Sequence, residues 1–259
     1  MAEPVAPIMS LDRVGKVFAN GVAALSNFTL DVSTGELVSL LGPSGCGKST
    51  VLRLMAGLMA PTTGRVFWPG SRIQDHRHEI GFVFQEPTLM PWADVADNVW
   101  MPLRLRGVSR KKASERIEEC LSLVGLEGFA DAYPRELSGG MKMRVSLARA
   151  LVLKPRLLLM DEPFGALDEI TRFRLNDDLL RLKRDLGATI VFVTHSIFES
   201  VSLSDRVIVM SPRPGTVAAE IRIDATPERG IAFRTSQSYG DLCRDISQVL
   251  ANVATGTET

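Results

Sequence analysis

The chain of 259 residues carries no surplus of charge and few cysteines. Thirty lysines and arginines balance thirty aspartates and glutamates. A protein that binds nucleic acid through its phosphates usually has a basic surplus on at least one face, so this balance argues against that class. The cysteines number three, lie far apart, and are Cys46, Cys120 and Cys243. We therefore expect free thiols in a reducing cytoplasm.

Long apolar runs are also missing. No stretch approaches the roughly eighteen consecutive apolar residues that suggest a membrane-spanning helix, so we do not expect the chain to cross a bilayer by itself. The first residues lack the charged and apolar segments of a signal peptide, and we expect residues 1–7 to be a disordered leader. His76 and His78 have no cysteine nearby in the sequence, which argues against a metal site there.

Short apolar strands alternate with helical patterns along most of the chain. Asn20-Gly21 and Thr34-Gly35 are turn sequences that separate the first strands, which predicts antiparallel pairing there. The predicted strands cover residues 14–18, 28–32, 37–41, 80–84, 156–160, 190–193, 207–210 and 216–223. The predicted helices cover residues 48–58, 109–125, 169–186 and a segment that begins near Ser138. This alternation favours an α/β fold with a mostly parallel sheet between helices.

A glycine-rich loop joins the third predicted strand to the first helix. The residues Gly42 to Ser49 match the pattern G-x-x-x-x-G-K-[ST]. In this pattern backbone N–H groups surround phosphate oxygens at a helix N-terminus, where the helix dipole favours anions. Lys48 is expected to reach the outer phosphates, and the Ser49 hydroxyl to ligate Mg²⁺. A glycine turn that binds no nucleotide is the alternative, but the strand–loop–helix context favours a phosphate site.

Two acidic residues follow a second buried strand. The run Leu157 to Met160 is apolar and leads directly into Asp161 and Glu162. Open α/β sheets bind ligands at the carboxyl ends of their strands. Asp161 suits the outer shell of Mg²⁺, and Glu162 suits a general base that polarises the attacking water. An apolar run before two acids is often only a strand end, so this motif depends on the glycine loop for its meaning.

A third motif opens the helix that begins near Ser138. Leu137-Ser138-Gly139-Gly140-Met141 combines a serine cap with two glycines, which leaves backbone N–H groups exposed to an anion. With the other two motifs, and in this order, it resembles the signature loop of the ABC ATPases. The resemblance spans residues 8–215. It implies a RecA-like P-loop NTPase core with an antiparallel β subdomain and an inserted helical subdomain, and it implies hydrolysis of ATP with Mg²⁺.

The same resemblance implies how two copies meet. They pair head to tail, so that each phosphate loop holds ATP against Ser138, Gly139 and Gly140 of the other copy, and Asp168 contacts the partner. Gln85 resembles the glutamine that contacts Mg²⁺ and the attacking water, and His195 the switch histidine at the γ-phosphate. Phe18 matches the aromatic residue that stacks on adenine, although a core role is the alternative. The complete nucleotide-binding set in one chain is Phe18, Gly42, Pro43, Ser44, Gly45, Cys46, Gly47, Lys48, Ser49 and Thr50.

Three positions depart from the family pattern. Met141 and Met143 stand where glutamines are usual, and Ser196 stands where many relatives carry aspartate after the histidine. The serine and glycines that face the anion are intact, so we expect activity to survive these changes. Glu162 and His195 are both present, which disfavours a regulatory nucleotide-binding module without turnover.

Further short motifs point to a subfamily. They resemble those of the bacterial importers for nitrate, sulfonates and taurine, and comprise Pro91-Trp92, Asn98-Val99, Thr171-Arg172 and Pro212-Arg213-Pro214-Gly215. This resemblance implies integral membrane permease subunits, a periplasmic solute-binding protein as an indirect partner, and a peripheral position at the cytoplasmic face of the plasma membrane. The sequence does not name the solute. The alternative is a soluble ABC ATPase that acts on nucleic acid or the ribosome, but the chain has neither a long coiled-coil insertion nor a second cassette.

The domain prediction has three parts. Residues 8–215 form the ATPase domain with a helical subdomain at 88–150, and residues 216–259 form an extension with a strand and a helix. We expect residues 216–259 to be dispensable for ATP chemistry. Five apolar residues predict one amphipathic helix there that packs on the core, with solute sensing or a dimer contact as the alternative; they are Phe233, Tyr239, Leu242, Ile246 and Val249. Leu89 and Trp92 are candidates for a permease-binding groove, with simple packing as the alternative.

Overall fold

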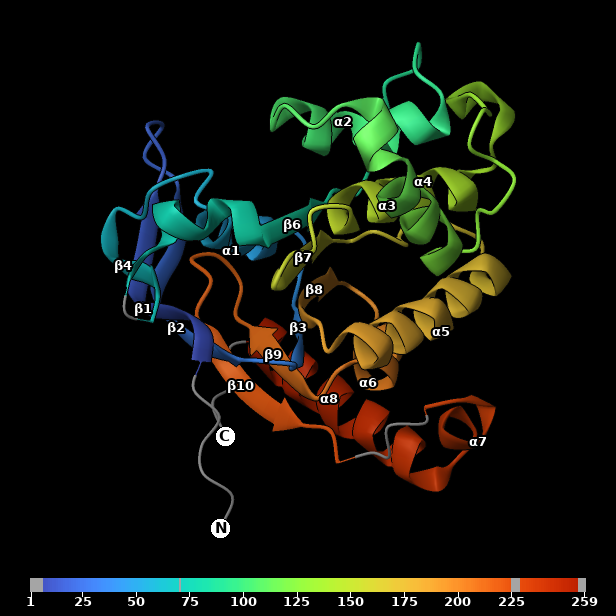
Figure 1. Ribbon diagram of the computed structural model, residues 1–259. Helices are drawn as coiled ribbons and strands as arrows, with labels where there is room; N and C mark the ends of the chain where they lie inside the picture. The colour runs from blue at the N-terminus through green and yellow to red at the C-terminus, as the bar shows by residue number, and fades with distance from the viewer. Residues whose placement is uncertain (1–6, 70, 225–228, 256–259) are drawn as a thin grey trace.

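The computed structural model describes residues 7–69, 71–224 and 229–255 of the chain. An antiparallel sheet lies on the left of Figure 1, a larger sheet fills the middle, and a group of three helices stands at the upper right. Residues 1–6 of the expected leader lie outside the described residues, and Pro7 already belongs to the first strand. The arrangement is the α/β fold that the sequence predicted.

The antiparallel sheet has the order β2-β1-β4-β5. Its strands are β1 (Pro7–Val17), β2 (Ala23–Ser33), β4 (Thr63–Trp68) and β5 (Ser71–Arg72). The turn sequences predicted β1 and β2, which are antiparallel as expected and longer than the apolar runs alone indicated. They did not predict β4. Its first three residues are polar or glycine and exposed, so tertiary pairing with β1 forms this strand where local pattern does not.

The central sheet has the order β10-β9-β3-β8-β7-β6. From β9 to β6 neighbouring strands run parallel, and β10 adds an antiparallel edge. Every residue of β3, β7 and β8 is buried, as expected for strands covered on both faces. The strands are β3 (Leu37–Leu41), β6 (Ile80–Val83), β7 (Leu157–Asp161), β8 (Thr189–Thr194), β9 (Arg206–Met210) and β10 (Val217–Arg222).

The helical subdomain packs on one side of this sheet. Its helices α2, α3 and α4 share one apolar core with α5 and the strands β6 and β7. The side chains of Ser109, Ser138 and Asp168 accept hydrogen bonds from backbone N–H groups in the first turns of α3, α4 and α5. The helices are α1 (Lys48–Met55), α2 (Val95–Leu105), α3 (Arg110–Leu123), α4 (Gly139–Leu151), α5 (Glu169–Leu186) and α6 (Ile197–Leu203), with short 3-10 turns η1 (Ile73–Glu79) and η2 (Pro134–Glu136).

The C-terminal segment is part of the same fold. It consists of β10, a short helix α7 (Ile231–Arg234) and α8 (Gln237–Thr255). The prediction of one amphipathic helix was wrong for Phe233, which lies on α7, because the chain breaks its helical path between Arg234 and Gln237. Tyr239 and Ile246 of α8 are buried against β3, β9 and α6, so this segment completes a core cluster of its own.

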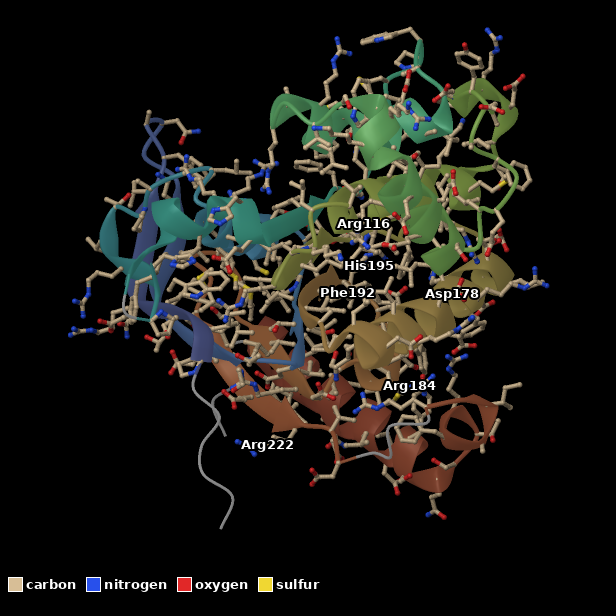
Figure 2. All side chains as sticks on the ribbon, in the orientation of Figure 1. Arg116, Asp178, Arg184, Phe192, His195 and Arg222 are labelled. Carbon is tan, nitrogen blue, oxygen red and sulfur yellow. The ribbon has the colours of Figure 1, made fainter. Side chains whose placement is uncertain are left out.

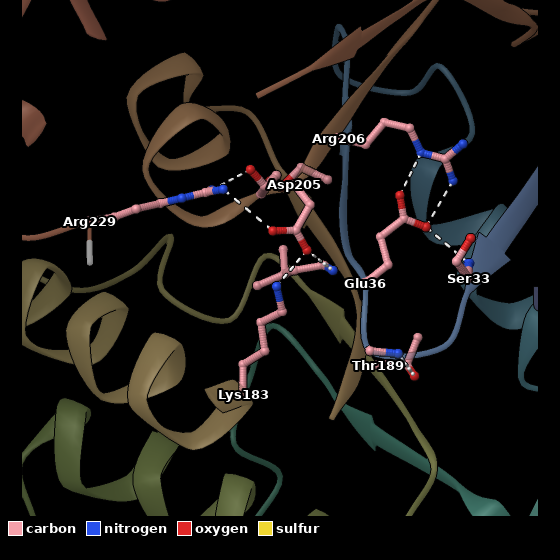
Figure 3. A network of polar contacts seen from close by, with 11 residues as sticks. Ser33, Glu36, Lys183, Thr189, Asp205, Arg206 and Arg229 are labelled. Carbon is pink, nitrogen blue, oxygen red and sulfur yellow. Dashed lines mark hydrogen bonds and ion pairs between the residues drawn. The ribbon is translucent and has the colours of Figure 1, made fainter. Parts of the chain in front are cut away.

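A polar network fastens this segment to the rest of the molecule (Figure 3). The Asp205 carboxylate accepts from the backbone N of Leu37 at 2.7 Å and pairs with Lys183 of α5 and Arg229 of the C-terminal segment. Nearby, Arg206 binds Glu36 at 2.9 Å. Because one carboxylate joins β3, α5 and the segment after β10, the C-terminal segment contributes to the fold.

Among the described residues, no helix is both long enough and apolar enough to cross a membrane. The cysteines Cys46, Cys120 and Cys243 are buried, unpaired thiols. Burial raises the pKa of the Cys120 thiol to about 11.

Candidate functional site

The glycine loop lies at the carboxyl end of β3, directly before α1. Gly47 is the N-cap of this helix and has a φ of 109°, a conformation that residues with a side chain rarely adopt. A Cβ atom there would lie 2.8 Å from Leu25 and 2.9 Å from the Ala24 carbonyl oxygen. Glycine is therefore required both by the backbone angle and by the strand beside it. This close approach positions the N-terminus of α1.

Lys48 is buried, with 5% of its surface exposed. Its ammonium group donates to the carbonyl oxygens of Gly42 at 2.7 Å and Pro43 at 3.0 Å, so it lies inside the loop. A buried ammonium group needs such acceptors, because water no longer solvates it. The positive charge is thereby held inside the glycine loop.

Ser49 and Asp161 come together across 112 positions of sequence. The Ser49 hydroxyl donates to Asp161 Oδ1 at 2.9 Å. Burial raises the pKa of the Asp161 carboxyl, and the Ser49 hydrogen bond opposes this in part. A hydroxyl and a carboxylate in contact are the oxygen ligands that Mg²⁺ prefers. Among the described residues, no cluster of three or more histidines, cysteines or acids provides an all-protein metal site. The donor set therefore suits a cation that keeps water or phosphate oxygens as ligands.

Glu162 follows Asp161 at the end of β7, and its backbone is strained. Its φ of 45° lies in the left-handed region that a glutamate seldom occupies. Strain of this kind persists where the surroundings hold it, often at functional sites. Here the Glu162 N–H donates to the Val193 carbonyl of β8 at 3.0 Å, so strand pairing fixes the turn.

His195 lies directly beyond the end of β8, where Figure 2 labels it close to Phe192. Its Nδ1 is 3.3 Å from Glu162 Oε2. β7 and β8 are neighbours in the sheet, and their carboxyl ends bring the two side chains together. Two of the predicted catalytic residues are thus in contact, with the imidazole placed to orient the carboxylate.

A cavity of about 420 Å³ lies over the glycine loop. Eight of the predicted residues line it, and they are Phe18, Ser44, Gly45, Gly47, Lys48, Ser49, Thr50 and Glu162. Phe18 follows β1 and is 37% exposed, so it does not belong to the core. The remaining loop residues lie beneath: Gly42 and Pro43 bind Lys48, and Cys46 is buried. The cavity thus combines an aromatic side chain with the glycine loop, which suit the base and the phosphates of a nucleotide.

Sequence reasoning missed Arg213 as a site residue. Arg213 lies in the turn after β9, lines the cavity, and donates from Nε to the Gly45 carbonyl at 3.0 Å. The motif Pro212-Arg213-Pro214-Gly215 was noticed only as a subfamily feature. The place of this motif beside the glycine loop could not be inferred from the sequence, because it depends on β9 lying beside β3 in the sheet. Asn20 and Val22 of the β1–β2 turn also line the cavity.

The signature residues Ser138, Gly139 and Gly140 do not line this cavity. They open α4, where Ser138 and Gly139 are exposed. A Cβ on Gly140 would lie 2.7 Å from the Thr171 methyl group, so this glycine lets α4 approach α5. Asp168 is likewise outside the cavity and exposed; its hydrogen bonds from Thr171 lower the pKa of its carboxyl. Ser138, Gly139 and Asp168 are therefore exposed, whereas Gly140 is buried against α5.

Of the two methionine departures, Met143 is buried in the core of the helical subdomain, and Met141 packs against it in part. Packing therefore accounts for both methionines. The hydrogen bond that starts α4 does not depend on the Met141 side chain, because its donor is the Met141 backbone N–H.

Gln85 is exposed beyond the end of β6. In the sheet Val83 is paired with Met160, so Gln85 lies at the same edge as Glu162. The following loop is fixed to α4, because the Arg149 guanidinium donates to the carbonyl oxygens of Pro87 at 2.7 Å and Thr88 at 2.9 Å. The segment after Gln85 is thus tied to α4 by hydrogen bonds.

Beside this loop lies a surface cavity of about 310 Å³. Its apolar walls come from β6, α2 and the residues that follow β6 and α4, and include Phe82, Phe84, Met101, Pro102 and Leu153. Trp92 is 77% exposed, whereas Leu89 packs in part against the helical core. Neither of these two residues lines the cavity, so the structure does not join Leu89 and Trp92 to this hollow.

Comparison with known proteins gives consistent relatives. A family model described as "ABC transporter" matches residues 25–165. An ABC transporter ATP-binding protein of Methanocaldococcus jannaschii is 42% identical and covers 93% of this chain and 91% of its own length. A nitrate import ATP-binding protein of Synechocystis is 45% identical, covering 84% of this chain and 82% of its own. An aliphatic sulfonates import ATP-binding protein of Xanthomonas axonopodis is 46% identical, covering 83% and 86%.

Solved structures agree in fold. A dimeric ATP-binding cassette in a post-hydrolysis state, bound to ADP and phosphate, superposes with a TM-score of 0.75 at 35% identity, and covers 84% of this chain and all of that one. A subunit of an ABC transporter complex from Clostridium perfringens gives a TM-score of 0.78 at 26% identity, covering 98% of this chain and all of its own.

Proposed function

The chain belongs to the ATP-binding proteins of ABC transporters and is an ATPase; from that premise we propose that it energises the uptake of a small anion such as nitrate or an organic sulfonate. The solute class rests on the relatives named for nitrate and aliphatic sulfonates import. The single observation that carries the proposed mechanism is the cavity that joins Phe18, the glycine loop and Glu162, with His195 in contact with that carboxylate.

The nucleotide fits this cavity in one orientation. Phe18 stacks on adenine, and the loop N–H groups with Lys48 bind the phosphates. Lys48 then exchanges its loop carbonyl acceptors for phosphate oxygens. Arg213, which lies against Gly45 at the rim, adds a second positive charge beside the phosphates. The charged end of ATP therefore meets the part of the cavity with the most hydrogen-bond donors.

Ser49, Asp161 and Gln85 are the residues that would hold Mg²⁺. When bound, the ion neutralises charge that develops on the phosphate oxygens. Ser49 provides a hydroxyl ligand, and Asp161 orients it through the hydrogen bond of 2.9 Å. Gln85 reaches the site from the neighbouring strand edge. Ser49 lies on α1 after the glycine loop of β3, Asp161 at the end of β7 and Gln85 beyond the end of β6, so the cation site depends on the sheet order.

Glu162 accepts a proton from the attacking water, because its carboxylate lies at the cavity wall. His195 orients this carboxylate through Nδ1 and contacts the γ-phosphate when a second copy closes over the nucleotide. In that dimer the exposed Ser138 and Gly139 complete the phosphate site of the other copy, and Asp168 contacts the partner. The residues that act in one chain are thus separate from those that act across the dimer.

Closure of the dimer has to reach a membrane permease. We assign the docking of a short permease segment to the apolar cavity of Phe82, Phe84, Met101, Pro102 and Leu153, since Arg149 links the loop at its edge to α4. In this proposal the chain is a peripheral subunit at the cytoplasmic face of the membrane, and a solute-binding protein acts on the opposite side.

A matched pair of variants on one helix tests the docking site. Met101→Glu places a charge in the cavity, whereas Leu105→Glu places it on the same helix at a residue that is 79% exposed and outside the cavity. Met101→Glu is expected to abolish copurification with the coexpressed permease, while the ATPase rate of the isolated subunit stays within roughly twofold of wild type. Leu105→Glu should copurify normally. Equal copurification of both variants would contradict the assignment.

The solute class is tested in the reconstituted complex. ATPase stimulation is measured with the binding protein loaded with nitrate, with ethanesulfonate or with sulfate as a control. Stimulation by nitrate or the sulfonate is expected. A complex that responds to neither would refute the proposed solute class without affecting the ATPase assignment.

A further inference from the structure

A second cavity of about 300 Å³ lies between α5, α6 and the C-terminal helices α7 and α8. Figure 1 places these helices together at the lower right, away from the glycine loop beside α1. The cavity shares no lining residue with the nucleotide cavity. Its size is at the lower end of the range of ligand sites. It therefore needs an explanation separate from ATP binding.

The walls of this cavity carry buried polar atoms without a hydrogen-bond partner. Within the described part of the chain, Asn176 Oδ1 and Glu199 Oε1 accept no hydrogen bond, although Asn176 is 2% exposed and Glu199 is 7% exposed. Glu199 Oε1 has one weak ion-pair contact, 4.0 Å from Arg172 Nε. Buried polar groups are almost always paired, because leaving one unpaired costs about 1–3 kcal/mol. Both residues line the cavity, which makes them candidate acceptors for a bound donor.

Two arginines line the same cavity. Arg172 Nε and Arg234 Nε are also buried without a hydrogen-bond partner. Arg234 pairs with Asp177 through its terminal nitrogen and lies 5.3 Å from the Phe173 ring, so its guanidinium is held in place while Nε stays free. Guanidinium groups match the oxygens of carboxylates and sulfonates. Aromatic rings of Phe173, Phe198 and Tyr239 form the apolar walls.

We propose that this cavity binds a small organic acid that also carries an ammonium or hydroxyl donor, and that its binding is transmitted to His195. The acidic end meets Arg172 and Arg234, and the donor end meets Asn176 and Glu199. The short carbon chain between the two ends packs against the aromatic walls.

The link to His195 consists of hydrogen bonds. The Thr194 hydroxyl donates to Glu199 Oε2 at 2.5 Å and accepts from the Ser196 N–H at 3.0 Å, so Glu199 holds both neighbours of His195. Arg172 donates to the Leu167 carbonyl at 3.0 Å, next to Asp168. A ligand that engages Glu199 and Arg172 therefore acts on both segments at once. This second part of the proposal rests on the role proposed above for His195, whereas binding itself does not.

Binding is measured by calorimetry and thermal unfolding without nucleotide, so that the result is independent of ATP chemistry. The probes are β-alanine and 2-aminoethanesulfonate, which have both ends, with propanoate, ethanesulfonate and propylamine as compounds that lack one end. Both two-ended probes should raise the unfolding midpoint, and the one-ended compounds should bind at least roughly 10-fold more weakly. No shift with either two-ended probe up to 10-millimolar concentrations, roughly the weakest affinity of interest, would overturn the proposal.

Variants locate the binding. Asn176→Leu removes the unpaired oxygen and is expected to keep the fold, and Arg234→Gln removes the held guanidinium; both should lose probe binding. Arg174→Gln is the control, because Arg174 lies on α5 like Asn176 but is exposed and outside the cavity. Saturating probe should also change the ATPase rate of wild type at least roughly twofold and leave Asn176→Leu unaffected. Binding that persists in Asn176→Leu and Arg234→Gln would overturn the site, and an unchanged wild-type rate would overturn the link to His195.

Discussion

Replacement of Glu162 by Gln separates ATP binding from hydrolysis. The amide has the shape of the carboxylate and can keep a contact with His195 Nδ1, now 3.3 Å from Glu162 Oε2. It cannot accept a proton from water. Loss of a general base usually slows the chemical step by roughly 10²–10⁴-fold, which corresponds to about 2.7–5.5 kcal/mol of activation free energy.

ATP affinity should change little, because the phosphate contacts of the glycine loop and Lys48 are intact. The variant is therefore expected to accumulate as an ATP-bound dimer. The strained turn should also survive, since two backbone hydrogen bonds hold it and the side chain does not: the Glu162 N–H donates to the Val193 carbonyl, and the Gly165 N–H donates to the Glu162 carbonyl. A similar unfolding midpoint for the variant and wild type would show this.

The assay is single-turnover hydrolysis with enzyme in excess over labelled ATP, together with light scattering to detect the dimer. Glu118→Gln, an exposed carboxylate on α3, is the matched control and should hydrolyse ATP at the wild-type rate. A single-turnover rate for Glu162→Gln within roughly threefold of wild type would show that another group accepts the proton.

Four further predictions follow from the same structure. Lys48→Ala should weaken MgATP binding at least about 100-fold, since a charged donor to the phosphates is lost, and unchanged affinity in equilibrium titration would contradict the phosphate role. Phe18→Ala should weaken ATP binding by about 5- to 150-fold and Phe18→Trp should restore it, as fluorescent-nucleotide titration can check. Burial raises the pKa of the Asp161 carboxyl above its value in the unfolded chain, so the unfolding midpoint should fall as pH rises through that pKa. Asp161→Asn should remove this fall and should abolish Mg²⁺-dependent hydrolysis. A pH profile of the midpoint that is the same in the variant and in wild type would refute the raised pKa. Ile246→Ala, at a fully buried residue, should cost about 2–5 kcal/mol of unfolding free energy in denaturant titration, and a truncation after Pro214 that remains folded would show that the C-terminal core is not needed.

The local features of this protein were predictable from its sequence. The glycine loop, the acidic pair after β7 and the caps Ser109 and Ser138 each depend on residues within a few positions of one another. Helix α5 was predicted with its ends at Glu169 and Leu186, because Gly187 adopts the left-handed conformation that stops a helix. Such features follow from backbone geometry and short-range hydrogen bonds, which a single segment determines alone.

Contacts between distant segments of the chain were decided by the tertiary structure, because they depend on the order of the strands and the packing of the helices. β4 forms on a polar, exposed segment because β1 offers it a pairing edge. Arg213 reaches Gly45 because β9 lies beside β3, although 168 positions separate the two residues. The cavity around Asn176 and Glu199 exists because α7 and α8 fold back onto α5 and α6. Contacts between residues so far apart are selected by the packing of the whole sheet and its helices, so no local pattern in the sequence contains them.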